Sequence, residues 1–234
     1  MDKLNYTTYS HTITNPRDNF NKDAFLIKEN WFVVADGISS KGSAGAEAAI
    51  LATNRIKETN LEDIVAPKDL KEILSNLSSE IRNFGGGTTF TSICIKNDHL
   101  ILAHTGDSEC HVISNSGSIK EITKPFTLAH ERYLKGSLDK KDLKNTPYCS
   151  NVLTSYLGAR KLELEIQIEK VTLKNVSAII LCSDGANIVP SEKMRDLVSN
   201  SNLENPAKEI SELAAELGSQ DDITVIVAKF ASVV

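Results

Sequence analysis

The stretch AIILCSDGAN, residues 178–187, is an apolar run with strand character that stops at Asp184 and Gly185. Asp-Gly is a common turn between strands, because both residues tolerate the backbone angles of tight turns. A single Asp-Gly would therefore indicate only a turn. Residues 31–37, WFVVADG, repeat the same form and end at Asp36 and Gly37. The repetition raises the question of why a buried strand should deliver a carboxylate to its tip.

The composition is that of one soluble globular domain. The 234 residues are 41% hydrophobic and 24% charged, which is enough for a full core. A formal net charge of −5 argues against binding to nucleic acid or anionic lipid. The first residues, MDKLNYTTYSHT, lack the pattern of a signal peptide, and no apolar run approaches the roughly 20 residues that span a bilayer. We expect a single domain over residues 1–234, a cytoplasmic monomer with no nucleic-acid or membrane partner.

Four cysteines are scattered along the chain without a C-x-x-C pair: Cys94, Cys110, Cys149 and Cys182. A cytoplasmic chain of this size does not need disulfides, so we expect free thiols in or near the core. None is followed six positions later by the arginine that cysteine-dependent phosphatases use to hold phosphate. The pattern therefore does not favour a thiol nucleophile.

The first third of the chain predicts two strands and then two helices. Strands at 23–28 and 31–35 form a hairpin through Glu29-Asn30, and an Ala-, Ile- and Leu-rich helix runs from Ser43 to about Thr59. A second helix follows Pro67. Its apolar residues have the i, i+3, i+4, i+7 spacing of one buried face: Leu70, Ile73, Leu74, Leu77 and Ile81.

The remainder predicts mainly strands joined by turns, with helices in pairs. We expect strands at 89–95, 100–104, 109–114, 163–168, 176–182 and 223–230. Two helices lie between the last two strands, one capped by Ser191 and one by Asn205 with Pro206 in its first turn. Residues 124–151 are polar and poorly periodic, which predicts an irregular, flap-like segment. This order favours an α+β fold with antiparallel sheets covered by helices.

Acidic residues recur where strands begin or end. Asp221 comes shortly before the strand at 223–230, and antiparallel pairing of that strand with 176–182 would bring Asp221 beside Asp184. Asp107 lies in a turn between strands. Several carboxylates at one edge would repel each other without a cation between them. Because all these candidates are oxygen donors, the set favours Mg²⁺ or Mn²⁺ over zinc.

The histidines predict no ligand set of their own, because each is isolated in the sequence: His11, His99, His104, His111 and His130. We interpret each as a surface or hydrogen-bonded side chain. Two divalent ions about 3.5–4 Å apart can hold a hydroxide and direct it at phosphorus, which is phosphoester hydrolysis without a protein nucleophile. Arg17 could then take two phosphate oxygens. An ordinary solvated surface arginine is the alternative interpretation of Arg17.

Taken together, the motifs of the sequence resemble those of a known family. Six segments follow one another in the order and spacing of the metal-dependent PPM family, the type 2C protein serine/threonine phosphatases: VVADG, GGTTFTSICI, LILAHTGDSE, VLTSYLGA, IILCSDG and DDITVIVAKF. The chain is most similar to the compact bacterial members, from about Thr12 to Phe230. The resemblance implies a four-layer α-β-β-α sandwich of two antiparallel sheets flanked by helix pairs. It also implies hydrolysis of phosphoserine and phosphothreonine by a metal-bridged hydroxide.

The resemblance implies a ligand set for two Mn²⁺ or Mg²⁺ ions. In this family the aspartate matching Asp36 bridges the two ions, and the carbonyl matching Gly37 binds one of them. The aspartates matching Asp184 and Asp221 bind the other. Bacterial members often hold a third, weaker ion through the aspartate matching Asp107.

The resemblance also implies roles for Asp23 and Arg17. The aspartate matching Asp23 organises water at the metals, and the arginine matching Arg17 grips the substrate phosphate. A phosphorylated protein is the implied substrate. A cognate serine/threonine kinase is a candidate partner, and we expect selectivity to lie in residues 124–151.

The sequence departs from the family pattern at four places. Arg17 lies one residue further from Asp23 than the family spacing, and Lys22 stands where Glu or Gln is usual. Residues 38–45, ISSKGSAG, replace a segment that commonly contains a histidine, the proposed general acid in some members. Glu109 replaces an arginine in GDSR and has no evident role.

The sequence also has features of two other functions. Residues 37–43 resemble a nucleotide-binding P-loop, but Ser43 stands where the phosphate-binding lysine is required. A regulatory pseudophosphatase that binds phosphoproteins without turnover would be consistent with Lys22 and with the missing histidine. The three retained aspartates argue against it, because buried unpaired carboxylates are costly without a metal.

Overall fold

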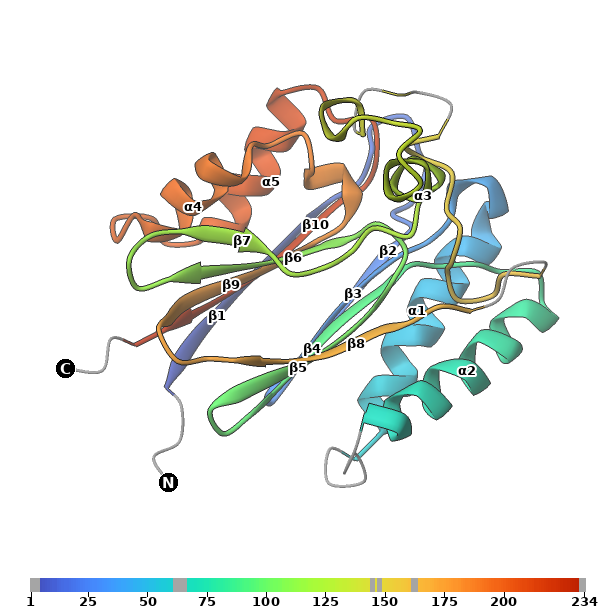
Figure 1. Ribbon diagram of the computed structural model, residues 1–234, viewed down its shortest axis with the longest axis horizontal. Helices are drawn as coiled ribbons and strands as arrows, with labels where there is room; N and C mark the ends of the chain where they lie inside the picture. Colours follow the sequence, from blue (N-terminus) through green and yellow to red (C-terminus); the bar gives the residue numbers. More distant parts are fainter. Residues whose placement is uncertain (1–4, 61–66, 144–145, 147–148, 161–163, 232–234) are drawn as a thin grey trace.

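The structure is a computed structural model that describes residues 5–60, 67–143, 146, 149–160 and 164–231. Two antiparallel five-stranded sheets pack face to face, and helices cover their outer faces (Figure 1). This arrangement confirms the expected α+β sandwich of four layers.

One sheet has the strand order β1-β10-β9-β6-β7. Its strands are β1 (Tyr6–Ile13), β10 (Ile223–Phe230), β9 (Val176–Cys182), β6 (Glu109–Ser114) and β7 (Ile119–Glu121). The other sheet has the order β2-β3-β4-β5-β8. Its strands are β2 (Asp23–Lys28), β3 (Trp31–Asp36), β4 (Phe90–Lys96), β5 (His99–Thr105) and β8 (Gln167–Thr172). All of the strand pairs are antiparallel, so the predicted pairing of β9 with β10 is confirmed.

The helices lie in pairs outside the sheets, as Figure 1 shows. α1 (Ser43–Glu58) and α2 (Pro67–Asn83) cover the β2-β8 sheet, and α4 (Ser191–Ser199) and α5 (Pro206–Glu216) cover the β1-β7 sheet. The segment predicted to be irregular contains a short helix, α3 (Leu128–Leu134), and a 3-10 turn, η3 (Lys140–Asp142). Two further 3-10 turns are η1 (Ser39–Lys41) and η4 (Asp184–Ala186).

Three apolar cores hold these four layers together. The buried faces of α1 and α2 pack on the β2-β8 sheet around Trp31 and Leu74, and those of α4 and α5 pack on the β1-β7 sheet around Ile180 and Val225. A third core lies between the two sheets and includes Leu102. Strands with apolar residues on both faces, such as β3, fit this arrangement because they are buried on both sides.

The structure corrects the sequence-based elements in three places. β1 and β7 were not predicted, because both are edge strands rich in polar residues, mostly half-buried in β1 and mostly exposed in β7. The strand predicted at 163–168 corresponds to β8, which begins at Gln167, and residue 163 lies outside the described residues. Ladder bonds start there because Gln167 pairs with His104, next to the end of β5. Ser191 is the first residue of α4 rather than its cap, and Pro190 precedes it without a side-chain bond.

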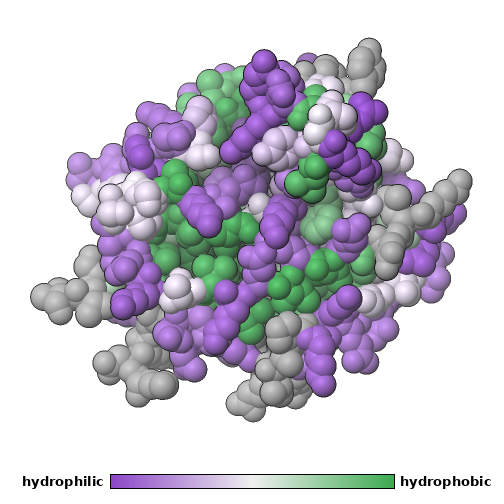
Figure 2. Space-filling view, viewed as in Figure 1, coloured by the Kyte–Doolittle hydropathy of each residue, from purple (hydrophilic) through white to green (hydrophobic). Residues whose placement is uncertain are grey.

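Hydrophobic atoms reach the surface between the two sheets. Figure 2, viewed from the same side as Figure 1, shows green areas between hydrophilic side chains on this face. Partly buried residues that pack on the inter-sheet core include Val112, Ile122 and Val171. Among the described helices, none combines the length and the apolar character needed to cross a membrane.

Candidate metal centre

Asp36 and Asp23 meet at one end of the hairpin β2-β3. Asp36 is the last residue of β3 and pairs directly with Asp23, the first residue of β2. The Asp36 backbone is held by Thr88 and Thr89, because its N–H donates to Thr89 Oγ1 at 3.0 Å and its carbonyl accepts from Thr88 Oγ1 at 2.9 Å. These bonds fix the backbone of Asp36 at the end of β3 and thereby position its buried carboxylate.

Asp184 and Asp221 come from the other sheet. Antiparallel pairing places Cys182 opposite Val225, so that the turn η4 after β9 lies beside the residues that precede β10. Ser183 joins the two sheets, because its hydroxyl donates to Asp23 Oδ2 at 2.7 Å. The cluster therefore lies at the ends of β3 and β9, where Ser183 links the two sheets.

Asp107 lies in the turn that carries the chain from β5 in one sheet to β6 in the other. Gly106 precedes it with φ of +105°, a backbone angle that favours glycine. Phe126 N donates to the Gly106 carbonyl at 2.7 Å, which ties the start of the 124–151 segment to this turn.

The five aspartates repel one another. Burial raises the pKa of Asp36 well above its ordinary value, and the charges of the other four raise it further. Burial and the charges of Asp184 and Asp222 raise the pKa of Asp23 to about 7. The five carboxylates cannot all be ionised at neutral pH without added positive charge.

The other three aspartates show the same effect. Burial and the charge of Asp221 raise the pKa of Asp184 to about 6, although a hydrogen bond with the Asp36 carboxyl opposes the shift. Burial, and then the charge of Asp184, raises the pKa of Asp107 well above its ordinary value. Burial also raises the pKa of Asp221, although the Asp222 N–H donates to its carboxylate at 2.9 Å.

The residues present fit divalent metal ions. Asp23 Oδ1 and Asp184 Oδ1 are buried and have no hydrogen-bond partner among the described residues. An orphaned buried carboxylate oxygen is costly, and a cation would satisfy it. The donors are all oxygens, which suits Mg²⁺ or Mn²⁺.

Two glycines allow close backbone approach at this centre. A Cβ on Gly37 would lie 2.6 Å from the Gly45 carbonyl and from the Lys22 carbonyl, and one on Gly185 would lie 2.1 Å from the Asp222 carbonyl. The glycine after each aspartate is therefore needed for packing between backbone segments, in addition to any role in a turn.

Asp222 contributes to the site, and the sequence did not predict this role. Its buried carboxylate accepts hydrogen bonds from Asn15 N at 2.8 Å and from Lys22 N at 2.7 Å. It thereby fixes both ends of the loop that carries Arg17. Its position directly after Asp221 was visible in the sequence, but its partners are about 200 residues away and no local signal points to them.

Lys22, the departure from the family pattern, is a buried structural cation. Its ammonium group forms an ion pair with Asp18 and lies 3.9 Å from Asp222 Oδ2. Burial lowers its pKa, but the carboxylates of Asp18, Asp222 and Asp221 outweigh that effect, so the net shift is upward. Lys22 therefore offsets part of the negative charge at this end of the molecule.

Arg17 is exposed in the loop between β1 and β2, and its backbone N–H donates to Asn15 Oδ1 at 3.1 Å. Through Asp222 this loop is held next to the aspartate cluster. Arg17 therefore lies on a loop that borders the candidate centre. None of the described contacts involves its guanidinium.

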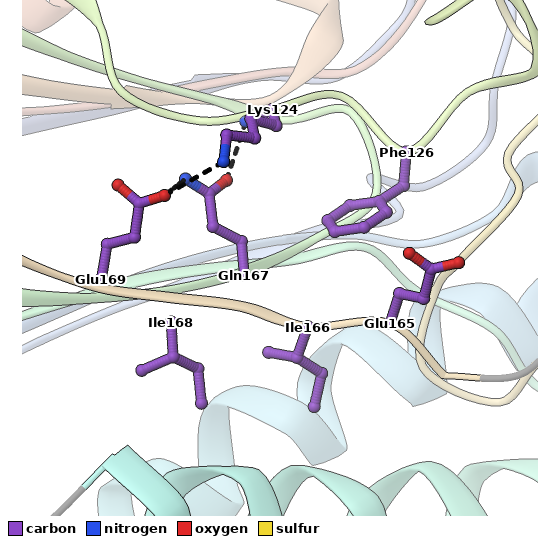
Figure 3. Close-up of a pocket in the computed structure, with 7 residues that line it drawn as sticks. All are labelled: Lys124, Phe126, Glu165, Ile166, Gln167, Ile168 and Glu169. Atoms are coloured by element: carbon purple, nitrogen blue, oxygen red, sulfur yellow. Dashed lines mark hydrogen bonds and ion pairs between the residues drawn. The ribbon is translucent and has the colours of Figure 1, made fainter. Parts of the chain in front are cut away.

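A pocket of about 340 Å³ lies beside β8 and is a different site (Figure 3). Lys124 and Glu169 form an ion pair at 3.3 Å across it, and Gln167 accepts from Lys124 N at 2.8 Å. Its described lining contains none of the five aspartates. The pocket is therefore separate from the candidate metal centre.

Comparison with known proteins identifies the family. A family model described as protein phosphatase 2C matches residues 15–224. The chain belongs to the protein phosphatase 2C family. It is a metal-dependent serine/threonine protein phosphatase of the PPM type, and the resemblance seen in the sequence is confirmed.

Two bacterial relatives illustrate the similarity of this phosphatase 2C to known proteins. The serine/threonine phosphatase stp of Listeria welshimeri is 28% identical over 226 residues, which cover 89% of this chain and 88% of the relative. The serine/threonine protein phosphatase PstP of Mycobacterium tuberculosis is 24% identical over 218 residues, 89% of this chain and 42% of the relative.

Solved structures share the phosphatase 2C fold. Stp1 from Staphylococcus aureus superposes with a TM-score of 0.87 at 22% identity, covering 99% of this chain and 96% of that one. The PstP catalytic domain in complex with two manganese ions superposes with a TM-score of 0.79 at 21% identity, covering 98% and 100%. A protein of the same fold has thus been crystallised with two manganese ions.

Proposed function

We propose that this phosphatase hydrolyses phosphoserine and phosphothreonine with two manganese or magnesium ions held by Asp36, Asp184, Asp221 and the Gly37 carbonyl. The observation that carries this assignment is the cluster of mutually repelling carboxylates with two orphaned oxygens. Two bound ions would neutralise that charge, polarise the phosphate and make water nucleophilic near neutral pH.

Asp23 has the position of a residue that orients the attacking water. Ser183 fixes its Oδ2, while its Oδ1 has no protein partner in the described part of the chain. One oxygen is thus held and the other is available to water, which gives Asp23 a positioning role. The pairing of Asp23 with Asp36 keeps that oxygen next to the metal ligands.

Arg17 is our candidate for the group that binds the substrate phosphate. A guanidinium can bind two phosphate oxygens at once. Support comes from the loop geometry, since Asp222 holds residues 15 and 22 beside Asp221. Residues 37–45 contain no histidine, so we assign the proton taken up by the leaving serine or threonine oxygen to water.

A third, weaker ion at Asp107 is a further part of the proposal. Burial, and then the charge of Asp184, raises the pKa of Asp107, because the two carboxylates repel each other. An ion between them would relieve that repulsion. Its affinity should be lower than that of the other two sites, because Asp107 is half-buried and its turn supplies one carboxylate.

We propose a phosphorylated protein as the substrate and a cognate serine/threonine kinase as its source. Selectivity would come from residues 124–151, whose start is tied to the Asp107 turn. We place the enzyme in the cytoplasm as a monomer, with residues 1–234 as one catalytic domain. The alternative is a pseudophosphatase that binds phosphoproteins without turnover.

The test is manganese-dependent release of phosphate from a phosphothreonine peptide. We expect activity in the wild type, and a rate lower by on the order of 100-fold or more in Asp184→Asn, because loss of a ligand removes several kcal/mol of metal-derived stabilisation. Asp196→Asn is the matched control, since Asp196 is exposed on α4. Inactivity of pure wild-type protein in excess Mn²⁺ would favour the pseudophosphatase, and an active Asp184→Asn variant would disprove the ligand assignment.

A further inference from the structure

Glu109, His111 and Cys182 form a buried cluster next to the metal centre. Glu109 pairs directly with Cys182 across β6 and β9, and His111 lies two residues along β6 on the same face. Their exposed fractions are 6%, 1% and 0%. Candidate ligand atoms from the three side chains all lie within 4.8 Å of one another. His111 is thus a hydrogen-bonded side chain, as interpreted from the sequence. The cluster around it was not predicted, because the cross-strand pairing that gathers it is not visible in the sequence.

We propose that Glu109, His111 and Cys182 bind a thiophilic divalent ion of the zinc class. Thiolate and imidazole are the ligands that zinc prefers, and a carboxylate commonly completes such a set. The all-oxygen centre beside it suits manganese or magnesium instead. The difference in donor chemistry separates the two sites, although they are close in space.

The geometry of the cluster suits a tetrahedral ion with small adjustments. Ligands of one zinc ion lie roughly 3.5 Å apart, given metal–ligand distances of about 2.0–2.3 Å. His111 Nε2 and Glu109 Oε2 are 2.8 Å apart, so an ion would enter by separating this pair. His111 Nδ1 is buried without a hydrogen-bond partner among the described residues, so one ring nitrogen is uncommitted. When the ion binds, a metal–sulfur bond replaces the S–H bond and the proton leaves to solvent.

Asn187 offers the fourth position. Its Oδ1 lies 3.9 Å from Cys182 Sγ, and the residue is half-buried, so it connects the cluster to solvent. Asn187 directly follows η4, the turn that carries Asp184. An ion held by β6 and by both ends of this turn would brace the segment that positions Asp184. The proposal thus gives a role to Glu109, which replaces the arginine of the family pattern.

Cobalt is the probe for this site, because Co²⁺ bound to a thiolate has a charge-transfer absorption that Co²⁺ bound only to oxygen lacks. The protein is first saturated with Mn²⁺ to fill the oxygen sites, and Co²⁺ is then titrated. We expect one equivalent of Co²⁺ to develop the absorption and Zn²⁺ to abolish it. Zn²⁺ should also raise the Tm of the Mn²⁺-saturated protein, because it binds only the folded form.

The matched pair of variants is Cys182→Ala and Cys110→Ala. Both thiols are fully buried and lie on paired strands, but Cys110 points into the inter-sheet core, on the opposite face from Glu109. We expect Cys182→Ala to lose the absorption and at least tenfold in Zn²⁺ affinity, and Cys110→Ala to keep both. His111→Asn should also weaken Zn²⁺ binding by at least tenfold.

Absence of the absorption in the wild type, or its survival in Cys182→Ala, would overturn the proposal. If Cys182→Ala does not fold, anomalous diffraction from wild-type crystals grown with Mn²⁺ and Zn²⁺ decides the question. A zinc peak between the three side chains supports the site, and zinc found only among the aspartates overturns it.

Discussion

Asp23 joins the two sheets through one side chain. Its Oδ2 accepts from Ser183, which follows a strand of the opposite sheet, while its Oδ1 is buried with no hydrogen-bond partner among the described residues. Burial is the largest cause that raises its pKa to about 7. In the metal-free protein this carboxylate therefore opposes folding whenever it is ionised, and the bound ions would remove that cost.

The pH dependence of metal-free stability should report this carboxylate. The pKa of Asp23 in the folded protein, about 7, is above the ordinary value of 3.8, so the folded state binds the proton more tightly. Its contribution to stability is fully present below pH 3.8 and is lost as the pH rises toward 7. Asp23→Asn mimics the protonated form. In EDTA we expect the variant to be more stable than the wild type above pH 7, by a margin that shrinks as the pH falls toward 4.

Urea unfolding at a series of pH values measures that margin. Asp139→Asn serves as the control, because the Asp139 side chain is 76% exposed. A margin that is constant with pH, or one that grows on acidification, would show that Asp23 does not carry the shifted pKa.

Arg17 can be tested by a substitution that keeps the charge. Arg17→Lys retains one positive charge but loses the paired donors that fit two phosphate oxygens. We expect kcat/KM for a phosphothreonine peptide to fall by about 10-fold or more. The Tm should not change, because the Arg17 side chain is exposed. Steady-state kinetics beside Arg195→Lys, a change on α4, check this. Equal kinetics in wild type and Arg17→Lys would leave Arg17 as an ordinary surface residue.

At the level of the elements, the two residues before β10 have different contacts. Asp221 faces the other aspartates, whereas Asp222 turns to the loop between β1 and β2 and caps the N–H groups of Asn15 and Lys22. Because Asp222 is 1% exposed, its hydrogen bonds are shielded from water. The placement of the Arg17 loop therefore depends on an element that is distant in sequence.

Loss of this cap should destabilise the protein and loosen the loop. Asp222→Ala leaves the two buried N–H groups of Asn15 and Lys22 without their acceptor, at about 1–3 kcal/mol for each unsatisfied group, while the Lys22 ammonium keeps Asp18. We expect a fall of about 2–6 kcal/mol in the free energy of unfolding, and faster amide hydrogen exchange at residues 15 and 22. Asp196→Ala, an exposed change, should have little effect. Unaltered exchange at both amides would contradict this account of the loop.

Local patterns in the sequence predicted much of this centre. A buried strand followed by Asp-Gly marked Asp36 and Asp184, and the i, i+3, i+4 apolar spacing marked α2. Features that depend on strand register were not predictable from one sequence. The Asp222 contacts and the meeting of Glu109 with Cys182 both require knowledge of which strands pair and at which residues. Edge strands such as β1 were missed because half-buried residues give weak alternation.

On the scale of the whole molecule, the inter-sheet core sets the distance between the two halves of the site. Asp23 and Asp36 come from one sheet, whereas Asp184 and Asp221 border strands of the other. The packing of residues such as Leu102 and Ile179 holds the two sheets at a fixed position relative to each other. We therefore expect the candidate metal centre to be sensitive to substitutions far from any aspartate.

Leu102→Ala tests this dependence. Leu102 is fully buried between the sheets, and such truncations cost about 2–5 kcal/mol because they leave a cavity. We expect that loss in urea unfolding, together with a higher Mn²⁺ concentration for half-maximal activity. Leu134→Ala on α3, where the side chain is 70% exposed, is the matched control. A destabilised Leu102→Ala protein with wild-type Mn²⁺ dependence would separate core packing from metal binding.

The pairing of β1 with β10 along its full length, from Tyr6 with Phe230 to Ile13 with Ile223, has a consequence during protein synthesis. A growing chain on the ribosome holds Asp36 and Asp184 long before Asp221 and its strand have been made. With Asp221 as a metal ligand, as proposed, the enzyme should stay inactive until Asp221 and β10 have left the exit tunnel and β10 has paired with β1. Cleavage by a protease just before Ile223 should inactivate the enzyme for the same reason.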